Sequence, residues 1–198
     1  MYTLNNNQIT DIYKVTLDEF NTFANIAIPN GALCDIGTGG GRYAFKARQI
    51  GFKPVYGIDI DSMRVFECER KNRDREISFL KGDIENISTI FPIIKQMYLF
   101  NSITMMTDTL NFMKNKKNAL KNCYELLQAE GKLYISLSNP ENSMELYKDI
   151  YEDEVLELLS RNGLSSSQLE NLLLSLGFQI ELDIRHTNNS MFLVRGSK

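Results

Sequence analysis

Three aspartates stand at the ends of successive short apolar runs, which is how side chains gather at one edge of a parallel sheet. Asp35 lies at the end of the first run, Asp59 ends the second and Asp83 ends the third. Carboxylates there can accept hydrogen bonds from hydroxyl or amino groups of a ligand, or balance a positive charge. The spacing therefore predicts a binding site that three strand ends share.

A glycine-rich turn follows the first of these acids. Residues 35–41 read Asp-Ile-Gly-Thr-Gly-Gly-Gly, between an apolar run and a helical pattern. Glycines at such a turn let the backbone bend sharply and bring N–H groups close to a ligand. A glycine-rich turn can also be purely structural. The candidate cofactor contacts in this turn are Gly37, Thr38, Gly39, Gly41 and Arg42.

Two cofactor classes fit the turn. Residues 39–44 match the dinucleotide pattern G-x-G-x-x-A, and Asp59 lies 20 residues after Gly39, about where a ribose-binding acid would stand. Asp35 favours another ligand, because a carboxylate just before the first glycine would repel a pyrophosphate. S-adenosylmethionine (SAM) has an ammonium group, a sulfonium and no phosphate. SAM is therefore favoured, although Asp35 could also interact with a helix dipole.

The other two acids suit the nucleoside part of such a cofactor. Asp59 can accept hydrogen bonds from two ribose hydroxyls, and the apolar side chain of Ile60 can lie against adenine. Asp83 can accept a hydrogen bond from the adenine amino group, and the N–H of Ile84 can bind a ring nitrogen. Asp61 could also bind the ribose, but it is at least as good a helix N-cap.

Strand and helix patterns alternate from residue 31 onward, which indicates an α/β fold with a mostly parallel sheet. Strands are predicted at 32–36, 54–58, 77–80, 97–103, 132–137, 178–184 and 191–194. Helices are predicted at 10–27, 42–50, 62–72, 110–129 and 165–176, with a partly helical segment at 84–95. We expect a Rossmann-like, doubly wound, seven-stranded sheet that ends in an antiparallel hairpin around a turn at 187–190.

Composition narrows the class of protein. The chain has 198 residues, of which 43% are hydrophobic, so one domain with a full core is expected. We predict a helical cap over residues 1–30 and a core over residues 31–198. The net charge of −3 argues against a nucleic-acid partner. No apolar run approaches the roughly 20 residues of a membrane span, and the start of the chain lacks a signal-peptide pattern, so the cytoplasm is the expected compartment.

The cysteines do not indicate a metal or a redox role. Cys34, Cys68 and Cys123 are scattered, and no pair has the spacing of metal ligands. Buried thiols are the simplest interpretation for all three. We therefore expect neither a metal site nor disulfides.

The chain resembles the class I SAM-dependent methyltransferases, particularly small bacterial enzymes that act on small molecules or peptides. The resemblance rests on the segments 33–42, 56–60, 82–84 and 126–135 in that order, and it covers nearly all of the chain from residue 32. It implies that SAM is the cofactor and S-adenosylhomocysteine (SAH) the product.

The resemblance also implies a role for each matched position. Asp35, Gly37 and Gly39 would hold the methionine part, Asp59 the ribose, and Asp83 with Ile84 the adenine. Two further contacts, beside the sulfonium and methyl group, would be Asn101 and Ser102, which we place at the end of the fourth strand.

The chain departs from the family pattern in two places. The acid that often begins the fourth strand is missing, and Gln96 lies nearby. The Asn-Pro-Pro-Tyr type of signature, which the amino-methylating nucleic-acid enzymes of this fold show, is also absent after that strand. The first departure weakens the match around the fourth strand, and the second argues against a nucleic-acid substrate.

The chemistry demands no particular catalytic residue. Methyl transfer from SAM requires an aligned nucleophile and a dry site, and a base only where the nucleophile is protonated. His186, Asp108 and Tyr13 are weak candidates, because each has an equally good or better structural interpretation: an exposed hairpin residue, a helix N-cap and a core residue. Phe112 and the pair Met105–Met106 could line an acceptor pocket, but ordinary core packing is preferred.

We therefore expect a methyltransferase that acts on a small-molecule or peptide acceptor by direct displacement, as a monomer or a homodimer. Two alternatives remain. A nicotinamide-dependent oxidoreductase rests on residues 39–44 alone. A SAM-binding module without catalysis is compatible with the short insert between the fifth strand and Ser165, which leaves little room for a substrate domain.

Overall fold

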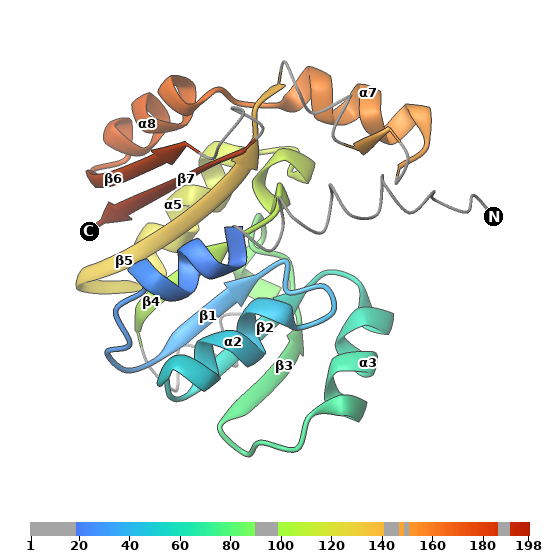
Figure 1. The fold of residues 1–198 in the computed structure, drawn as a ribbon, viewed down its shortest axis with the longest axis vertical. Coiled ribbons are helices and arrows are strands. Elements are labelled where there is room, and N and C mark those ends of the chain that lie inside the picture. Colours follow the sequence, from blue (N-terminus) through green and yellow to red (C-terminus); the bar gives the residue numbers. More distant parts are fainter. Residues whose placement is uncertain (1–18, 90–98, 141–146, 149–150, 186–190) are drawn as a thin grey trace.

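The computed structural model describes residues 19–89, 99–140, 147–148, 151–185 and 191–198. Its centre is a seven-stranded sheet with the order β3-β2-β1-β4-β5-β7-β6 (Figure 1). Strands β1 to β5 pair in parallel, and β7 runs antiparallel to both β5 and β6. The predicted Rossmann-like sheet with a closing hairpin is confirmed. The strands are β1 (Leu33–Ile36), β2 (Val55–Asp59), β3 (Ile77–Lys81), β4 (Phe100–Met105), β5 (Leu127–Ser138), β6 (Gln179–Arg185) and β7 (Met191–Ser197).

Helices cover both faces of the sheet, as a mostly parallel sheet requires. Residues 19–26 are helical, and the other helical elements are α2 (Arg42–Ile50), α3 (Ser62–Lys71), η1 (Ile87–Thr89), η2 (Thr109–Phe112), α5 (Lys116–Leu126), α7 (Asp153–Asn162) and α8 (Ser166–Ser175). One buried apolar cluster contains Phe23, Ala44 and Cys68 from helices 19–26, α2 and α3. The other contains Leu120 from α5 and Leu169 from α8.

Local signals in the sequence set most helix ends. Gly51 ends α2 with φ +117°, a value that favours glycine. Asp61 begins α3 by accepting a hydrogen bond from the N–H of Met63. Ser165 and Gln168 form the predicted capping box at the start of α8.

The helix predicted at 110–129 is wrong in its extent. It is two elements, η2 and α5, because Asn115 starts a new helix by accepting a hydrogen bond from the N–H of Asn118. Residues 127–129 belong to β5, where Leu127 lies opposite Phe100 of β4. Pairing with a distant strand here outweighs local helix propensity, which is a weak determinant.

The fourth strand is also displaced from its predicted range. It ends at Met105 instead of residue 103, and it pairs Ser102 with Leu33 and Thr104 with Asp35. Asn101 and Ser102 therefore stand at the beginning of the strand. The turn predicted at 187–190 and residues 1–18 of the proposed cap lie outside the described residues, so the division at residue 30 stays a prediction.

Three further observations concern the described residues alone. None of their helices combines the length and apolarity that a membrane crossing requires. No group of three or more His, Cys, Asp or Glu side chains in this part of the chain could hold a metal ion. Cys34, Cys68 and Cys123 are buried free thiols.

Candidate functional site

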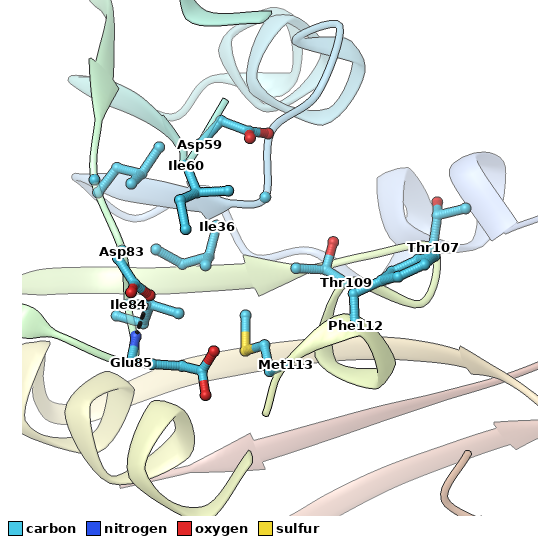
Figure 2. A pocket seen from close by; sticks show the side chains of 13 residues that line it. Ile36, Asp59, Ile60, Asp83, Ile84, Glu85, Thr107, Thr109, Phe112 and Met113 are labelled. Carbon is cyan, nitrogen blue, oxygen red and sulfur yellow. Dashed lines mark hydrogen bonds between the residues drawn. The ribbon is translucent and has the colours of Figure 1, made fainter. Parts of the chain in front are cut away.

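A cavity of about 340 Å³ lies at the carboxyl ends of β1 to β3, beside the turn that follows β4 (Figure 2). This volume lies within the range of small-molecule sites, roughly 300–1,000 Å³. Its lining residues come from four separate loops: Ile36, Gly37, Ile58, Asp59, Ile60, Gly82, Asp83, Ile84, Glu85, Thr107, Thr109, Phe112 and Met113. Five of the twelve residues predicted to bind the cofactor are among them: Gly37, Asp59, Ile60, Asp83 and Ile84.

Asp59 connects the glycine turn to the end of β2. Its Oδ2 accepts a hydrogen bond from the N–H of Gly39 at 2.8 Å, and its Oδ1 accepts one from the N–H of Asp61 at 2.9 Å. A carboxylate has about four acceptor positions, so both oxygens keep capacity for a ligand hydroxyl. The side chain is only half-buried on the cavity wall, where a ligand can reach it.

An apolar slot lies next to Asp59. Ile60 is 67% exposed although it is a large aliphatic residue, while Ile36 and Ile84 are almost fully buried. Figure 2 shows Ile60 across the same space from Ile36 and Ile84. A flat aromatic ring in this slot would cover the exposed face of Ile60 and remove apolar surface from water.

Asp83 and Glu85 form the other polar wall. Asp83 Oδ1 accepts a hydrogen bond from the N–H of Glu85 at 2.9 Å, which fixes the turn after β3. The Glu85 carboxylate accepts hydrogen bonds from the backbone N–H groups of Lys114 and Asn115, which joins this wall to the loop before α5. Two carboxylates therefore face the slot opposite Asp59 (Figure 2).

Asp35 lies beneath the cavity and is not one of its lining residues. It is 2% exposed, and its two oxygens accept hydrogen bonds from the hydroxyls of Thr38 and Thr104, both at 2.7 Å. Burial raises the pKa of Asp35 to about 6, although the hydrogen bonds from both hydroxyls partly offset this effect. Asp35 therefore joins the glycine turn to β4.

Three glycines of the turn have positive φ, and Gly39 is one of them with φ +52°. Gly37 has φ +68°, and a Cβ there would lie 2.4 Å from Thr109 Cγ2. Gly41 has φ +82° and packs against Phe45, so it shapes the start of α2. Arg42 is not among the residues that line the cavity, and its guanidinium lies 4.5 Å from the centre of the Phe20 ring.

Asn101 and Ser102 do not belong to this site. Asn101 Oδ1 accepts a hydrogen bond from the N–H of Ala32 at 2.9 Å, at the amino end of the sheet. Both residues line a separate cavity there of about 360 Å³, together with Gln128 and Lys132. The prediction that they end the fourth strand is wrong, because strand pairing shifts β4 toward its C-terminus.

The end of β4 instead presents a strained turn. Thr107 and Asp108 have φ values of +51° and +62°, an uncommon region for residues with side chains, above all for a β-branched one. Thr107, Thr109 and Phe112 line the cavity, and Phe112 is 40% exposed. Met105 and Met106 are buried core residues, as preferred from the sequence.

The catalytic candidate Asp108 is enclosed by structural partners. Its Oδ1 accepts hydrogen bonds from the hydroxyl and N–H of Ser138 and from the amide of Asn111, and its Oδ2 accepts one from the hydroxyl of Tyr147 at 2.6 Å. Burial raises its pKa. It occupies the N-cap position of η2 without capping the backbone. His186 and Tyr13 lie outside the described residues.

The sequence did not reveal four residues of the cavity wall, Glu85, Thr107, Thr109 and Met113. Glu85, Thr107 and Met113 lie in turns or loops, and Thr109 begins the short helix η2. None of them belongs to a periodic pattern, and only chain folding brings them together. Glu19, a buried acid behind Thr107, was also missed. A signal existed, because Glu19 falls between Val15 and Phe23 on the apolar stripe of its helix.

The chain is similar to known methyltransferases in sequence pattern and in fold. Residues 29–172 match the family described as methyltransferase domain. No curated protein matches the chain significantly.

Several solved structures share the fold at low sequence identity. A SAM-dependent methyltransferase from Mesorhizobium loti is 14% identical with a TM-score of 0.70, and covers 91% of this chain and 97% of its own. The magnesium protoporphyrin IX methyltransferase of Synechocystis with bound SAH is 16% identical with a TM-score of 0.71. The match covers 99% of this chain and 89% of that one. A TehB-like SAM-dependent methyltransferase from Corynebacterium glutamicum is 15% identical with a TM-score of 0.66. The match covers 97% of this chain and 96% of that one.

The nicotinamide alternative is supported by one short pattern, whereas the methyltransferase family matches most of the chain. The chain belongs to the methyltransferase-domain family and carries a class I SAM-dependent methyltransferase domain.

Proposed function

We propose that this domain transfers the methyl group of SAM to a small-molecule or peptide acceptor by direct displacement and releases SAH. The observation that carries the proposal is the cavity wall itself: half-buried carboxylates, Asp59 and Asp83, flank an apolar slot beside a glycine turn. Hydrogen-bond-accepting acids on either side of an apolar slot suit an adenosine, whose ribose hydroxyls and adenine amino group are donors.

The residues after successive strands fit successive parts of the cofactor. Asp59 would accept the ribose hydroxyls, and Ile60 with Ile36 would enclose the adenine. Asp83 would accept the adenine amino group, beside the N–H of Ile84. Bound SAM supplies a methyl group on a good leaving group, so the chain has to orient the acceptor and exclude water.

The methionine part would lie near Gly37, between the glycine turn and the turn after β4. Asp35 would act there through Thr38, from whose hydroxyl it accepts a hydrogen bond, and not by direct contact, because it is 2% exposed and does not line the cavity. This arrangement modifies the expectation that Asp35 meets the ammonium group itself.

The acceptor would occupy the end of the cavity formed by Thr107, Thr109 and Phe112. This wall combines two hydroxyl side chains with one exposed aromatic ring. The net charge of −3 and the cavity of about 340 Å³ suit a small or narrow acceptor better than a nucleic acid.

The direct test is calorimetry on the full chain with SAM, SAH and NADH. We expect binding of SAM and SAH and none of NADH, whereas binding of NADH alone would overturn the proposal. Incubation with methyl-labelled SAM and a cell extract then separates an enzyme from a binding module. A labelled product supports transfer, while SAM binding without any labelled product contradicts it.

A further inference from the structure

Glu19 is a fully buried acid at the acceptor end of the cavity. Its carboxylate accepts hydrogen bonds from the N–H of Thr107 at 2.9 Å, from the hydroxyl of Thr107 at 3.0 Å, and from the hydroxyl of Ser136. Among the described residues, no cationic side chain forms an ion pair with it. A buried acid without a cation is costly to keep, so its position calls for an explanation.

The surroundings of Glu19 raise its pKa toward neutral pH. Burial raises the pKa of Glu19 to about 7, and the nearby Tyr43 hydroxyl and the hydrogen bonds from Thr107 offset part of that effect. In the part of the chain that the structure describes, the titratable groups that face it are Tyr43 on α2, Asp108 beside Thr107, and Tyr147. A group with such a pKa can both accept and release a proton under physiological conditions.

Thr107 connects this acid to the cavity. It lines the cavity beside Phe112 at the end opposite Asp83 (Figure 2), while its hydroxyl hydrogen is directed to the Glu19 carboxylate. Its φ of +51° is uncommon for a β-branched residue. Backbone strain persists where surrounding contacts hold it, and the bond from the Thr107 N–H to Glu19 is one such contact.

The direction of the hydroxyl hydrogen has a chemical consequence. An ionised carboxylate only accepts hydrogen bonds, so Thr107 must donate to Glu19. The Thr107 oxygen has two lone pairs. The buried Tyr43 hydroxyl lies beside Thr107 and can use one of them, and the other remains for a donor group of the acceptor. An amine or hydroxyl of the acceptor would satisfy it.

We propose that Thr107 and Glu19 form a proton relay for the methyl acceptor, and that the acceptor therefore reacts through a nitrogen or oxygen that bears hydrogen. The relay rests on the proposed methyl transfer. The lone pair of the nucleophile forms the bond to the methyl carbon, and the electrons of the broken carbon–sulfur bond stay on sulfur. The proton of the nucleophile passes to the Thr107 oxygen, whose own proton passes to the Glu19 carboxylate. Glu19 is thus a positioning residue that acts through Thr107.

The first test follows the proton on Glu19 without any turnover. Infrared difference spectra of the wild type and Glu19→Gln, recorded against pH, isolate the carboxyl band of Glu19. We expect it to titrate near pH 7, and at lower pH with SAM than with SAH, because only SAM carries the sulfonium charge. Titration below about pH 5, near the ordinary value of a glutamate, or equal titration with both ligands, would overturn the relay.

The second test uses Thr107→Val, which removes the hydroxyl at nearly constant shape, with Thr107→Ser as the matched control. With labelled SAM and a cell extract, we expect wild-type product labelled on nitrogen or oxygen. Glu19→Gln and Thr107→Val should slow transfer by about a hundredfold or more. In both variants the transfer rate should lose its dependence on pH near 7, whereas Thr107→Ser should keep this dependence. SAH affinity should stay unchanged in every variant.

The two proposals fail in different ways. A wild type that binds no SAH removes the proposed function, and the relay with it. A wild type that binds SAM but labels nothing also removes the proposed transfer, and the relay with it. A wild type that binds SAH but labels only carbon or sulfur overturns the relay alone. So does a Thr107→Val protein that is folded by circular dichroism and keeps the wild-type pH profile.

Discussion

The acids on the β2–β3 side of the site differ from those on the β4–β5 side in their burial and in the groups that donate hydrogen bonds to them. Asp59 and Asp83 accept hydrogen bonds from backbone N–H groups and stay half-exposed on the cavity wall. Glu19 and Asp108 are buried and accept hydrogen bonds mainly from side-chain groups, both hydroxyls and an amide. Acids of one chemical type thus have two different environments at the same sheet edge.

The two environments correspond to two roles, ligand binding for the half-exposed acids and structural support for the buried ones. A half-exposed carboxylate keeps its charge at little expense and can receive a ligand. A buried one holds loops together, but its charged form is destabilised, so its pKa rises. Asp35 on the central strand has the second kind of environment, and it joins the two sides through Thr38 and Thr104.

The largest expected effect is on the buried side. Asp108→Ala should lower the free energy of unfolding by about 4 kcal/mol, because the hydroxyls of Ser138 and Tyr147 and the amide of Asn111 lose a buried acceptor. Urea denaturation measures it. Asp108→Asn keeps the shape of the side chain and should lower the free energy of unfolding by less. A loss under about 1 kcal/mol for Asp108→Ala would show that these contacts are not structural.

Glu19 gives the buried side a pH signature. Its folded pKa of about 7 exceeds the ordinary glutamate pKa of 4.5, so the folded state binds the proton more tightly. The resulting stability is fully present below pH 4.5 and is lost as pH rises to about 7, a change of about 3 kcal/mol at 1.36 kcal/mol per pKa unit. The stability difference between the wild type and Glu19→Gln should fall by this amount across that interval. Denaturant titrations at a series of pH values measure it, and a constant difference would contradict the burial effect.

Asp59→Ala tests the exposed side. It should weaken SAH binding by about 2 kcal/mol, or roughly thirtyfold, because ribose hydroxyls lose a charged acceptor. Calorimetry measures the affinity. Asp61→Ala is the matched control, since it removes the neighbouring cap of α3 and lowers stability by about 1 kcal/mol without touching the cavity wall. Equal loss of affinity in both variants would assign the effect to the loop and not to Asp59.

Asp83→Ala should have a smaller effect on the same measurement. The adenine amino group would lose one hydrogen bond, so SAH affinity should fall by about 1 kcal/mol, or roughly fivefold. The fluorescence of a bound adenosine analogue would check the same step. An unchanged affinity would place the adenine elsewhere along the apolar slot.

The smallest effect is expected at the opposite edge of the sheet. Asn101→Ala removes the acceptor for the Ala32 N–H but lies away from the cavity, so SAH affinity should stay within about twofold of the wild type. A tenfold loss in calorimetry would restore the role that its predicted strand-end position implied.

The parts of the fold that follow from neighbouring residues were predictable. The order of strands and helices, the end of α2 at Gly51, and the capping box at Ser165 all depend on contacts within a few residues. The boundary between α5 and β5 was missed, because Leu127 leaves the helical pattern to pair with Phe100, 27 residues earlier in the chain.

Within the site, local patterns in the sequence were enough to place the glycine turn, Asp59 as the last residue of β2, and Asp83 two residues after β3. Those features are local, since a strand that runs into glycines or an aspartate ends where its pattern ends. Contacts between distant parts of the chain place Asn101 near the start of its strand, bury Asp35, and bring Glu19 behind Thr107. Burial and strand register depend on residues far apart in the chain, and no local pattern specifies which of them meet.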